Sequence, residues 1–427
     1  MKIGVMHWAF PPVVGGVESH LLYLYEELAG LGHDVSILTA PHKDRDDDAY
    51  PWCNIHSEDL MSIDFCLNKA GPDRLRRVYE MMESFIVRQE PDIVHAHNFH
   101  YFVPDHAECV DILSHKYGLP IVLTIHNYWA DDLCRSLLRD IRWDRIVAVS
   151  YFMKSPCIFD AHLPSNRLEV HYHGVNLDKY RVMEDMAAIK SKLGLSGRHV
   201  VFHPARACWS KGSFHGIMAA AKLKQKYPDI CLILSGNGDS VDFDGERPSF
   251  QSEADSLVKK LKMENNVLFI NATGDEMPVY MNAADVIIYP TIFPQGEAFG
   301  LAPVEAMACG RPVIVTDSGG LVESTFNDIN GLVVDRNPDT LADKLAFSID
   351  RLLSDRDYAE YLGKNGREVA IERFDSKKMA LRMEYLYHRL VNARIAQKIK
   401  RLSDIARSGS SGLARIRAAN CSTSRTI

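Results

Sequence analysis

The sequence predicts an α/β protein made of two Rossmann-like, doubly wound domains that face each other across a cleft. Short apolar segments alternate with helical patterns over the first 150 residues, which is typical of a parallel sheet with helices on both faces. A second series of the same kind begins near residue 199. The length of 427 residues exceeds one ordinary domain and suits two, each with a sizeable core.

The first half opens with an apolar segment at residues 2–6, and a helical pattern follows at residues 18–31. The next four apolar segments predict strands at residues 34–39, 92–96, 120–125 and 145–150. Their alternation with longer connections favours parallel pairing, because parallel neighbours need a crossover between them.

In the second half, a helical pattern at residues 215–226 follows the first strand. The predicted strands lie at residues 199–203, 230–235, 267–270, 286–289 and 312–315. Ligands of open α/β sheets bind beyond the carboxyl ends of the strands, so we expect the site in the cleft between the domains.

The amino-acid composition bears on the partners, the metal sites and the location of the protein. The formal net charge of −7 argues against nucleic acid as the main partner. The nine cysteines show no paired short spacing of the kind that binds zinc or forms a redox motif. The chain starts directly with a strand, and no apolar run is long enough to span a bilayer, so we expect a cytoplasmic protein.

Two carboxylates, Glu297 and Glu305, frame a predicted helix start at Phe299 or Gly300. A helix start presents free N–H groups and the positive end of a dipole, which suits a diphosphate, and Gly300 adds no Cβ to obstruct it. One carboxylate could meet a sugar and the other a ribose. A single glutamate here would be explained equally well as a capping or solvated side chain, but the pair favours a sugar-nucleotide site.

Arg206 and Lys211 follow the first strand of the second half. A guanidinium grips two phosphate oxygens and an ammonium neutralises charge, so the two could hold a diphosphate leaving group. Alone, such cations after a strand are usually solvated surface charges. Their occurrence together with Glu297 and Glu305 favours the functional interpretation.

The region from residue 280 to 335 resembles the signature region of retaining, GT-B-type glycosyltransferases of family four. The similarity rests on the two glutamates at the family's spacing, on Ala308-Cys309-Gly310-Arg311-Pro312, on Gly319-Gly320 and on Asn330-Gly331-Leu332. The first half adds Gly15-Gly16-Val17-Glu18, His95-Ala96-His97, Thr124-Ile125-His126 and His173-Gly174-Val175. The resemblance covers roughly residues 1 to 390.

The resemblance implies a transferase that uses a nucleotide sugar, with UDP as the expected nucleotide, and an unknown hydroxyl acceptor. It implies that Glu297 orients the sugar, Glu305 holds the ribose, and Arg206, Lys211 and the Gly300 helix start stabilise the leaving diphosphate. It also places His126 near the donor sugar. The remaining donor-side residues implied are Gly16, Gly236, Asn271, Phe299 and Leu301.

Glu18, Asn98, Tyr128 and Trp129 are the candidates on the acceptor side, and the last two offer apolar faces on which a sugar ring could stack. Two positions depart from the family pattern. Ala205 stands where a glycine is common, and Asn127 stands where an aspartate is frequent.

No metal or other cofactor is expected. Asp242-Phe243-Asp244 has the form of a metal-binding Asp-x-Asp, but Arg206, Lys211 and a helix start already supply positive charge to a diphosphate. A sugar-nucleotide epimerase of the same two-lobe fold is the alternative function. A nicotinamide dehydrogenase is less well supported, because neither Gly15-Gly16 nor Gly236-Asn237-Gly238 completes a Gly-x-Gly-x-x-Gly pattern.

The expected organisation is an acceptor domain at residues 1–177, a donor domain at 178–375, and a helix at 376–394 that packs back on the first domain. Residues 395–427 are predicted to form a basic, disordered tail. A second hypothesis for the tail is that Ile399, Leu402 and Ile405 form an apolar stripe that makes weak contact with an anionic membrane.

Overall fold

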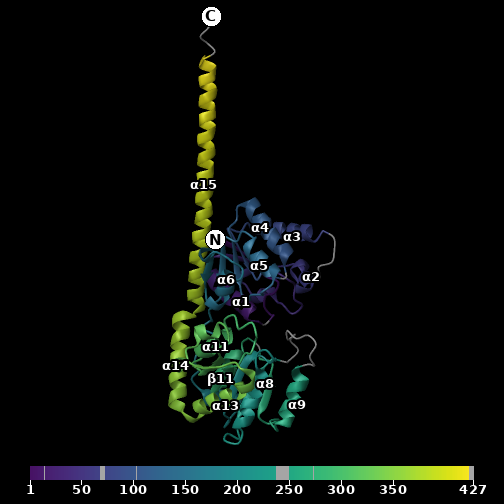
Figure 1. The fold of residues 1–427 in the computed structure, drawn as a ribbon, viewed down its shortest axis with the longest axis vertical. Helices are drawn as coiled ribbons and strands as arrows, with labels where there is room; N and C mark the ends of the chain where they lie inside the picture. The colour runs from purple at the N-terminus through teal and green to yellow at the C-terminus, as the bar shows by residue number, and fades with distance from the viewer. Residues whose placement is uncertain (14, 68–72, 102, 237–249, 273, 423–427) are drawn as a thin grey trace.

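The computed structural model of the chain describes residues 1–13, 15–67, 73–101, 103–236, 250–272 and 274–422, with side chains up to residue 400 and at residues 403 and 404. It shows two α/β lobes stacked along the long axis of the molecule, with one long helix that runs beside the N-terminal lobe and continues beyond it (Figure 1). The predicted fold class is confirmed.

Lobe 1 is built on a seven-stranded sheet in the order β3-β2-β1-β4-β5-β6-β7, and all of its strand pairs are parallel. The strands are β1 (Lys2–Met6), β2 (Asp34–Thr39), β3 (Cys53–Ser57), β4 (Ile93–His97), β5 (Ile121–Ile125), β6 (Arg145–Ala148) and β7 (Leu168–Val170).

Lobe 2 is built on a six-stranded parallel sheet in the order β10-β9-β8-β11-β12-β13. The strands are β8 (Val200–Arg206), β9 (Cys231–Ser235), β10 (Val267–Ile270), β11 (Val286–Tyr289), β12 (Val313–Thr316) and β13 (Leu332–Val334). Residues 171–199 connect the sheets, and the division at residue 177 stays a prediction.

Helices occupy the connections between strands. In lobe 1 they are α1 (Gly16–Gly30), α2 (Ile63–Leu67), α3 (Arg74–Gln89), α4 (Pro104–Tyr117), α5 (Asp132–Arg139) and α6 (Tyr151–Phe159), with short 3-10 turns η1 (Asp47–Ala49), η2 (Asp59–Met61) and η3 (Ser165–Arg167). The later helices are α7 (Met186–Lys192), α8 (Ser213–Leu223), α9 (Phe250–Lys260), α10 (Met277–Ala283), α11 (Leu301–Ala308), α12 (Leu321–Ser324), α13 (Pro338–Ser354), α14 (Arg356–Arg373) and α15 (Ser376–Ser422).

The predicted strands are all present, and no end differs from its prediction by more than three residues. Three further strands, β3, β7 and β13, lie at sheet edges. Each has half-exposed positions, and β3 contains no fully buried residue. A strand at an edge needs no continuous apolar run, which is why sequence periodicity does not reveal these three.

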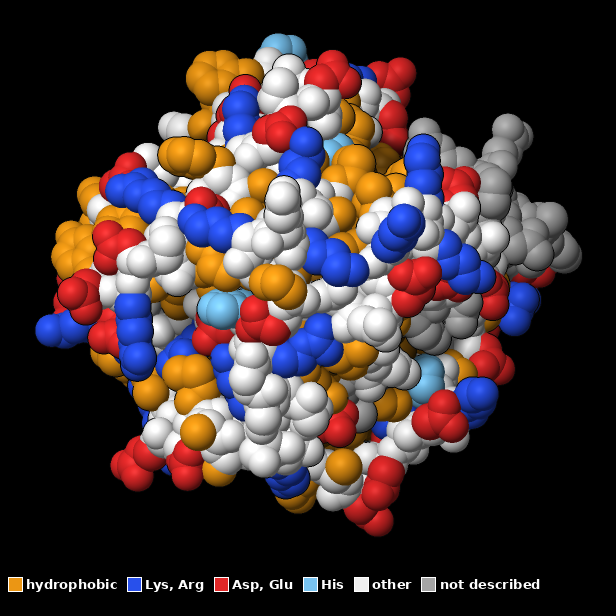
Figure 2. Space-filling view, turned by 90° about the horizontal axis from the view of Figure 1, so that it is seen from below, with side chains coloured by type: hydrophobic (Ala, Val, Ile, Leu, Met, Phe, Trp, Pro, Cys, Tyr) orange, Lys and Arg blue, Asp and Glu red, His pale blue; other side chains and the backbone are white. Residues whose placement is uncertain are grey.

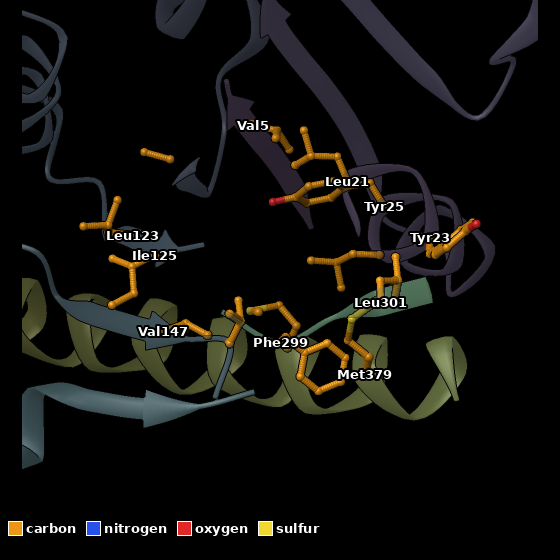
Figure 3. Packing of buried hydrophobic residues seen from close by; sticks show 14 of the residues in the cluster. Val5, Leu21, Tyr23, Tyr25, Leu123, Ile125, Val147, Phe299, Leu301 and Met379 are labelled. Atoms are coloured by element: carbon orange, nitrogen blue, oxygen red, sulfur yellow. The ribbon is translucent and has the colours of Figure 1, made fainter. Parts of the chain in front are cut away.

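One core cluster joins lobe 1, part of lobe 2 and α15. It includes Val5 and Leu123 from the first sheet, Phe299 from lobe 2, and Met379 from α15 (Figure 3). The lobes and the last helix therefore share apolar packing.

The last helix packs back on lobe 1, as predicted. His33 and Glu384 form an ion pair at 2.9 Å, and Arg394 reaches Asp144 at 3.0 Å. Beyond lobe 1 the helix continues outward (Figure 1), so the expectation of disorder from residue 395 differs from the structure, where α15 extends to Ser422. The segment contains no proline, and its alanine and arginine residues favour helix.

The end of the molecule that carries lobe 2 mixes basic and acidic side chains over its surface (Figure 2). No helix among the described residues combines the length and the apolar character needed to cross a bilayer. The Asp242-Phe243-Asp244 triplet lies outside the described residues, as do Asn237 and Gly238.

Gly174 is where lobe 1 meets the start of α15. A Cβ at this position would lie 2.6 Å from Cα and 2.9 Å from N of Ser376, both backbone atoms. Gly174→Ala is therefore expected to lower the free energy of unfolding by about 1–3 kcal/mol, the usual cost of overpacking. The measurement is urea unfolding, and the midpoint of the variant should be lower than that of the wild type.

Gly30→Ala is the matched control, because a Cβ there meets no atom within 4 Å and alanine favours the helix. Equal effects of the two substitutions would contradict this account of the junction.

Candidate active site

The centre of the candidate site is an ion pair in lobe 2. Lys211, in the loop between β8 and α8, places Nζ 2.6 Å from Oε2 of Glu297, in the loop after β11. Tyr289 at the end of β11 completes the group, since its hydroxyl lies 3.2 Å from Lys211 Nζ and 3.3 Å from the same carboxylate oxygen. Neighbouring parallel strands thus bring together residues 86 positions apart.

Burial opposes a charge on Lys211, but the Glu297 carboxylate and the Tyr289 oxygen overcome this and raise the pKa of the lysine. The pKa of Tyr289 is also raised, by burial and by the same carboxylate. Lys211 is therefore a fixed cation, held in place by a carboxylate and a phenol.

The loop that carries Glu297 is held by the turn at Gly319-Gly320. The backbone N–H of Gly320 donates to Glu297 O at 2.7 Å. Gly319 has a φ of +60°, and a Cβ there would lie 2.2 Å from Glu297 O, so only glycine fits. Gly300 precedes α11 with a φ of +83°, and Leu301 is the first residue of the helix. The predicted helix start is confirmed.

Arg206 ends β8 with an exposed side chain that makes no hydrogen bond or ion pair with the described residues. Gly236 follows β9 beside it, since a Cβ on Gly236 would lie 3.5 Å from Arg206 Cα. Asn271 follows β10 next to Gly236, whose N–H donates to Ile270 O at 2.8 Å. The parallel sheet thus places three predicted donor-side residues along one edge.

Glu305 is buried on α11 and faces lobe 1. Its Oε1 accepts a hydrogen bond from Tyr23 of α1 at 3.3 Å, and Tyr23 also lies 3.5 Å from the hydroxyl of Tyr180. Burial raises the pKa of Glu305 to about 7, although both tyrosine hydroxyls act in the opposite direction. This carboxyl group changes charge near neutral pH.

Further bonds cross between the lobes. Ser150 Oγ donates to Ala298 O at 2.6 Å, directly beside Glu297. The Glu323 carboxylate accepts from the N–H groups of Tyr151 and Phe152 at the start of α6, at 2.9 and 2.7 Å. Phe299 is buried and packs its ring against His173 at 5.3 Å, so it contributes to the interlobe core.

His126 lies directly after β5 and is buried. Its Nε2 is 3.0 Å from His97 Nδ1, and His97 Nε2 is 2.7 Å from the Tyr25 hydroxyl. The Tyr25 hydroxyl also lies 2.9 Å from His95 Nδ1, and His95 in turn contacts Tyr387 of α15 at 2.5 Å. A continuous hydrogen-bonded row therefore runs from the last helix to His126.

The imidazoles around His126 are held neutral. Burial lowers the pKa of His126, His97 and His20 well below the usual histidine value, and the neighbouring imidazoles add to the effect. Burial also lowers the pKa of His95 and His173 to about 3.

The acceptor-side candidates divide into two groups. Asn98 is buried, and its Oδ1 accepts the backbone N–H of His126 at 2.9 Å, so that oxygen positions His126. Tyr128 is half-buried, and its hydroxyl donates to Asp160 at 2.6 Å. Trp129 packs near the Tyr101 ring at 6.2 Å.

The two candidates on α1 lie at its start. Glu18 is 3.7 Å from His7 Nε2 at the end of β1. A Cβ on Gly16 would meet no atom within 4 Å, so this first residue of α1 leaves open space around its backbone.

Several residues of the site carried no signal strong enough to be predicted. Tyr23, Tyr25 and Tyr289 look like core aromatics in the sequence, and His20 looks like an ordinary helix residue. The one usable signal was His95-x-His97, because alternate residues of a strand share a face.

Comparison with protein families agrees with this arrangement. Residues 14–179 match the model "Glycosyltransferase Family 4", and residues 185–369 match "Glycosyl transferases group 1". The chain belongs to the family-four glycosyltransferases. Together the two matches cover both lobes of this glycosyltransferase, from the start of α1 into α14.

Individual relatives and solved structures are also glycosyltransferases. The N-acetyl-alpha-D-glucosaminyl L-malate synthase of Bacillus anthracis is 27% identical over 91% of this glycosyltransferase and 97% of the relative. Among solved structures, a glycosyltransferase from Rickettsia africae shares the fold at a TM-score of 0.75, with 22% identity over 91% of this chain and 99% of that one.

A second solved structure with the same fold is Anabaena HepE in complex with UDP-glucose. It has a TM-score of 0.72, with 20% identity over 91% of this glycosyltransferase and 100% of that chain. These relatives give no support to the epimerase alternative.

The buried histidines predict that acid destabilises this glycosyltransferase. Burial lowers the pKa of His100 and His106 to about 4, whereas the unfolded chain takes up these protons below about pH 6.5. The unfolded state then binds more protons, so stability falls as the pH drops from 6.5 towards 4. Each such histidine contributes about 1.4 kcal/mol per pH unit. Glu305 has the opposite effect, because its raised pKa makes the folded state take up a proton first as the pH falls. It is a single group, whereas several histidines are buried.

The measurement is urea unfolding at pH 7.5 and 5.5. The free energy of unfolding should differ between the two pH values by less in His106→Gln than in the wild type, because one buried histidine is removed. His388→Gln is the control, because that side chain is 57% exposed, and it should keep the wild-type difference. Equal stability at both pH values would contradict the assignment of neutral buried imidazoles.

Proposed function

We propose that this glycosyltransferase moves a sugar from a UDP-sugar to an acceptor hydroxyl and keeps the anomeric configuration of the donor. The observation that carries the proposal is the Lys211–Glu297 pair beside the start of α11, at the carboxyl ends of β8 and β11. Anabaena HepE, which has the same fold, is described in complex with UDP-glucose, and this supports UDP as the nucleotide.

The donor diphosphate would meet three positive groups. Arg206 is exposed at the end of β8 and offers a planar fork of donors to phosphate oxygens. Lys211 adds a fixed ammonium, and the first N–H groups of α11 after Gly300 add a helix terminus. Charge that develops on the diphosphate as its bond to the sugar breaks is stabilised by all three.

The transfer proceeds on one face of the sugar. The bond between the anomeric carbon and the diphosphate oxygen breaks, and the acceptor oxygen forms its bond from the same side. The acceptor proton passes to the departing phosphate oxygen, so no protein carboxylate needs to attack the sugar. The protein contributes orientation and electrostatic stabilisation.

Glu297 serves two functions in this proposal. Its Oε2 holds Lys211, and its other carboxylate oxygen is left to orient sugar hydroxyls. Glu305 would hold the ribose through the same carboxyl group whose Oε1 accepts a hydrogen bond from the Tyr23 hydroxyl of lobe 1 at 3.3 Å. Binding of the donor is thereby coupled to the contact between the lobes.

The acceptor would enter from lobe 1, past Glu18, Tyr128 and Trp129. Tyr128 and Trp129 are both half-buried and present ring surface that suits the apolar face of a sugar. His126, fixed by Asn98 and His97, would contact the donor sugar.

We infer that the diphosphate requires no divalent metal, because Arg206, Lys211 and the start of α11 supply the positive charge that a metal would otherwise provide. Donor turnover in the presence of a chelator should therefore equal turnover without it.

We place the protein in the cytoplasm, where thiols stay reduced, since the eight cysteines whose side chains are described are unpaired. The basic end of α15 would touch the inner face of an anionic membrane. Of the predicted stripe, Ile399 is 59% exposed on the same helix as Lys398 and Lys400, whereas the side chains of Leu402 and Ile405 lie outside the described ones.

Loss of Glu297 should abolish most donor turnover. With a panel of nucleotide sugars, wild-type protein is expected to release nucleoside diphosphate from one donor, and Glu297→Gln to lower kcat/KM by about 10²–10³-fold. Lys211→Met should have an effect of similar size, because it removes the other half of the pair. The measurement is the release of nucleoside diphosphate over time.

Glu264→Gln is the control, since Glu264 is an exposed glutamate of lobe 2 outside the site. Thermal unfolding of each variant shows whether the fold is intact. No release from any donor, and no rise in melting temperature with any nucleotide, would contradict the proposal.

Removal of residues 395–427 should weaken binding to vesicles that contain phosphatidylglycerol, with little change in binding to neutral vesicles. In the full chain, Lys398→Gln with Lys400→Gln should weaken binding by about 2 kcal/mol, from about 1 kcal/mol per basic side chain near the surface. The measurement is vesicle co-sedimentation at low salt. Equal binding of the full and shortened chains would rule out this membrane contact.

A further inference from the structure

Three buried histidines of lobe 1 point ring nitrogens at one place. His20 comes from α1, His97 from the end of β4, and His126 directly follows β5. Each offers one nitrogen, and the three nitrogens lie within 4.8 Å of one another. The three side chains are at most 3% exposed, so the cluster is not a set of surface histidines that happen to be close.

The cluster contains polar atoms that the protein leaves unpaired. Neither Nδ1 nor Nε2 of His20 has a hydrogen-bond partner among the described residues, and the same holds for His126 Nδ1. Nearly all buried polar side-chain atoms in proteins have a partner, so an imidazole with both nitrogens unpaired indicates a ligand.

The spacing of one pair of nitrogens is close to that of two ligands on one metal ion, and the His20 nitrogen lies within 4.8 Å of both its partners. His97 Nδ1 and His126 Nε2 are 3.0 Å apart. Two nitrogens bound tetrahedrally at about 2.0–2.1 Å from zinc are about 3.3 Å apart, so this pair needs only a small displacement. The hydrogen now held between them would move to the far nitrogen of its own ring, and the ring would stay neutral.

Surrounding groups already orient the rings. His97 is held through Nε2 by the Tyr25 hydroxyl at 2.7 Å, which leaves Nδ1 towards the cluster. Asn98 fixes the backbone of His126. Such outer partners support metal-binding histidines.

The donor set selects the kind of ion. Three imidazoles suit zinc, cobalt, nickel or copper, whereas magnesium and calcium prefer carboxylate and carbonyl oxygens. Three protein nitrogens also leave a fourth position for water or a hydroxyl group.

We propose that His20, His97 and His126 bind one divalent transition-metal ion of the zinc class, and that the bound ion inhibits sugar transfer by withdrawing His126 from the donor. The inhibitory half rests on the proposed function. The metal-binding half does not depend on it, and it concerns a place in lobe 1 separate from the diphosphate.

The experiment uses full-length protein without an affinity tag, stripped with chelator and dialysed. Cobalt(II) is the probe, because its visible absorption reports tetrahedral coordination and its ligands. One equivalent of cobalt per chain is expected to give a tetrahedral spectrum without the near-ultraviolet band of a thiolate ligand, and zinc should displace it. His20→Gln should weaken cobalt affinity by roughly tenfold or more.

His20→Gln is the primary variant because its nitrogens make no hydrogen bond in the described structure, so the fold should survive. His97→Gln is the second variant, with its melting temperature measured. His106→Gln is the control, since His106 is buried in the same lobe but bonds Leu60 O at 2.9 Å, and it should bind cobalt like the wild type.

Absence of a one-to-one cobalt spectrum, or unchanged affinity in His20→Gln, would overturn the metal site. A thiolate band would overturn it as well. Cobalt or zinc that binds as expected without slowing donor turnover would overturn only the inhibitory half. If no donor is turned over at all, the proposed function fails while the cobalt titration still decides the metal site.

Discussion

The half-buried ion pair between Lys211 and Glu297 organises the site. It joins the loop after β8 to the loop after β11 and fixes a cation where a diphosphate would lie. Removal of one partner leaves the other, a charge largely withdrawn from water, without its counter-charge. Tyr289 shares both partners, so the group behaves as a unit.

Contacts elsewhere in the molecule hold the loop that carries Glu297 in place. The Gly319-Gly320 turn holds the Glu297 loop by its backbone, and Ser150 reaches across from lobe 1 to the next residue, Ala298. The relative position of the lobes is set by apolar packing around Phe299 and by α15, which is anchored on lobe 1 through Glu384 and Arg394. The site is therefore sensitive to changes at the junction between the lobes.

Much of the fold could be predicted because central parallel strands are buried on both faces. The segments at β1, β9 and β11 have continuous apolar runs, and the predicted strands there agree with the structure within one residue. Edge strands such as β3 are half-exposed and left no such run. Disorder was expected after residue 395 because of charge composition, but helix propensity without proline prevails there.

The fold class, the glutamate pair, the two cations and the helix start at Gly300 can all be predicted from the amino-acid sequence, because each has a local pattern of spacing or residue type. Which side chains contact one another is visible only in the folded molecule. The tertiary structure pairs Lys211 with Glu297, turns Glu305 towards Tyr23, and brings His20, His97 and His126 together. The physical reason is that contacts in a parallel sheet follow from strand order and from the packing of one lobe on the other, and neither leaves a mark on local sequence periodicity.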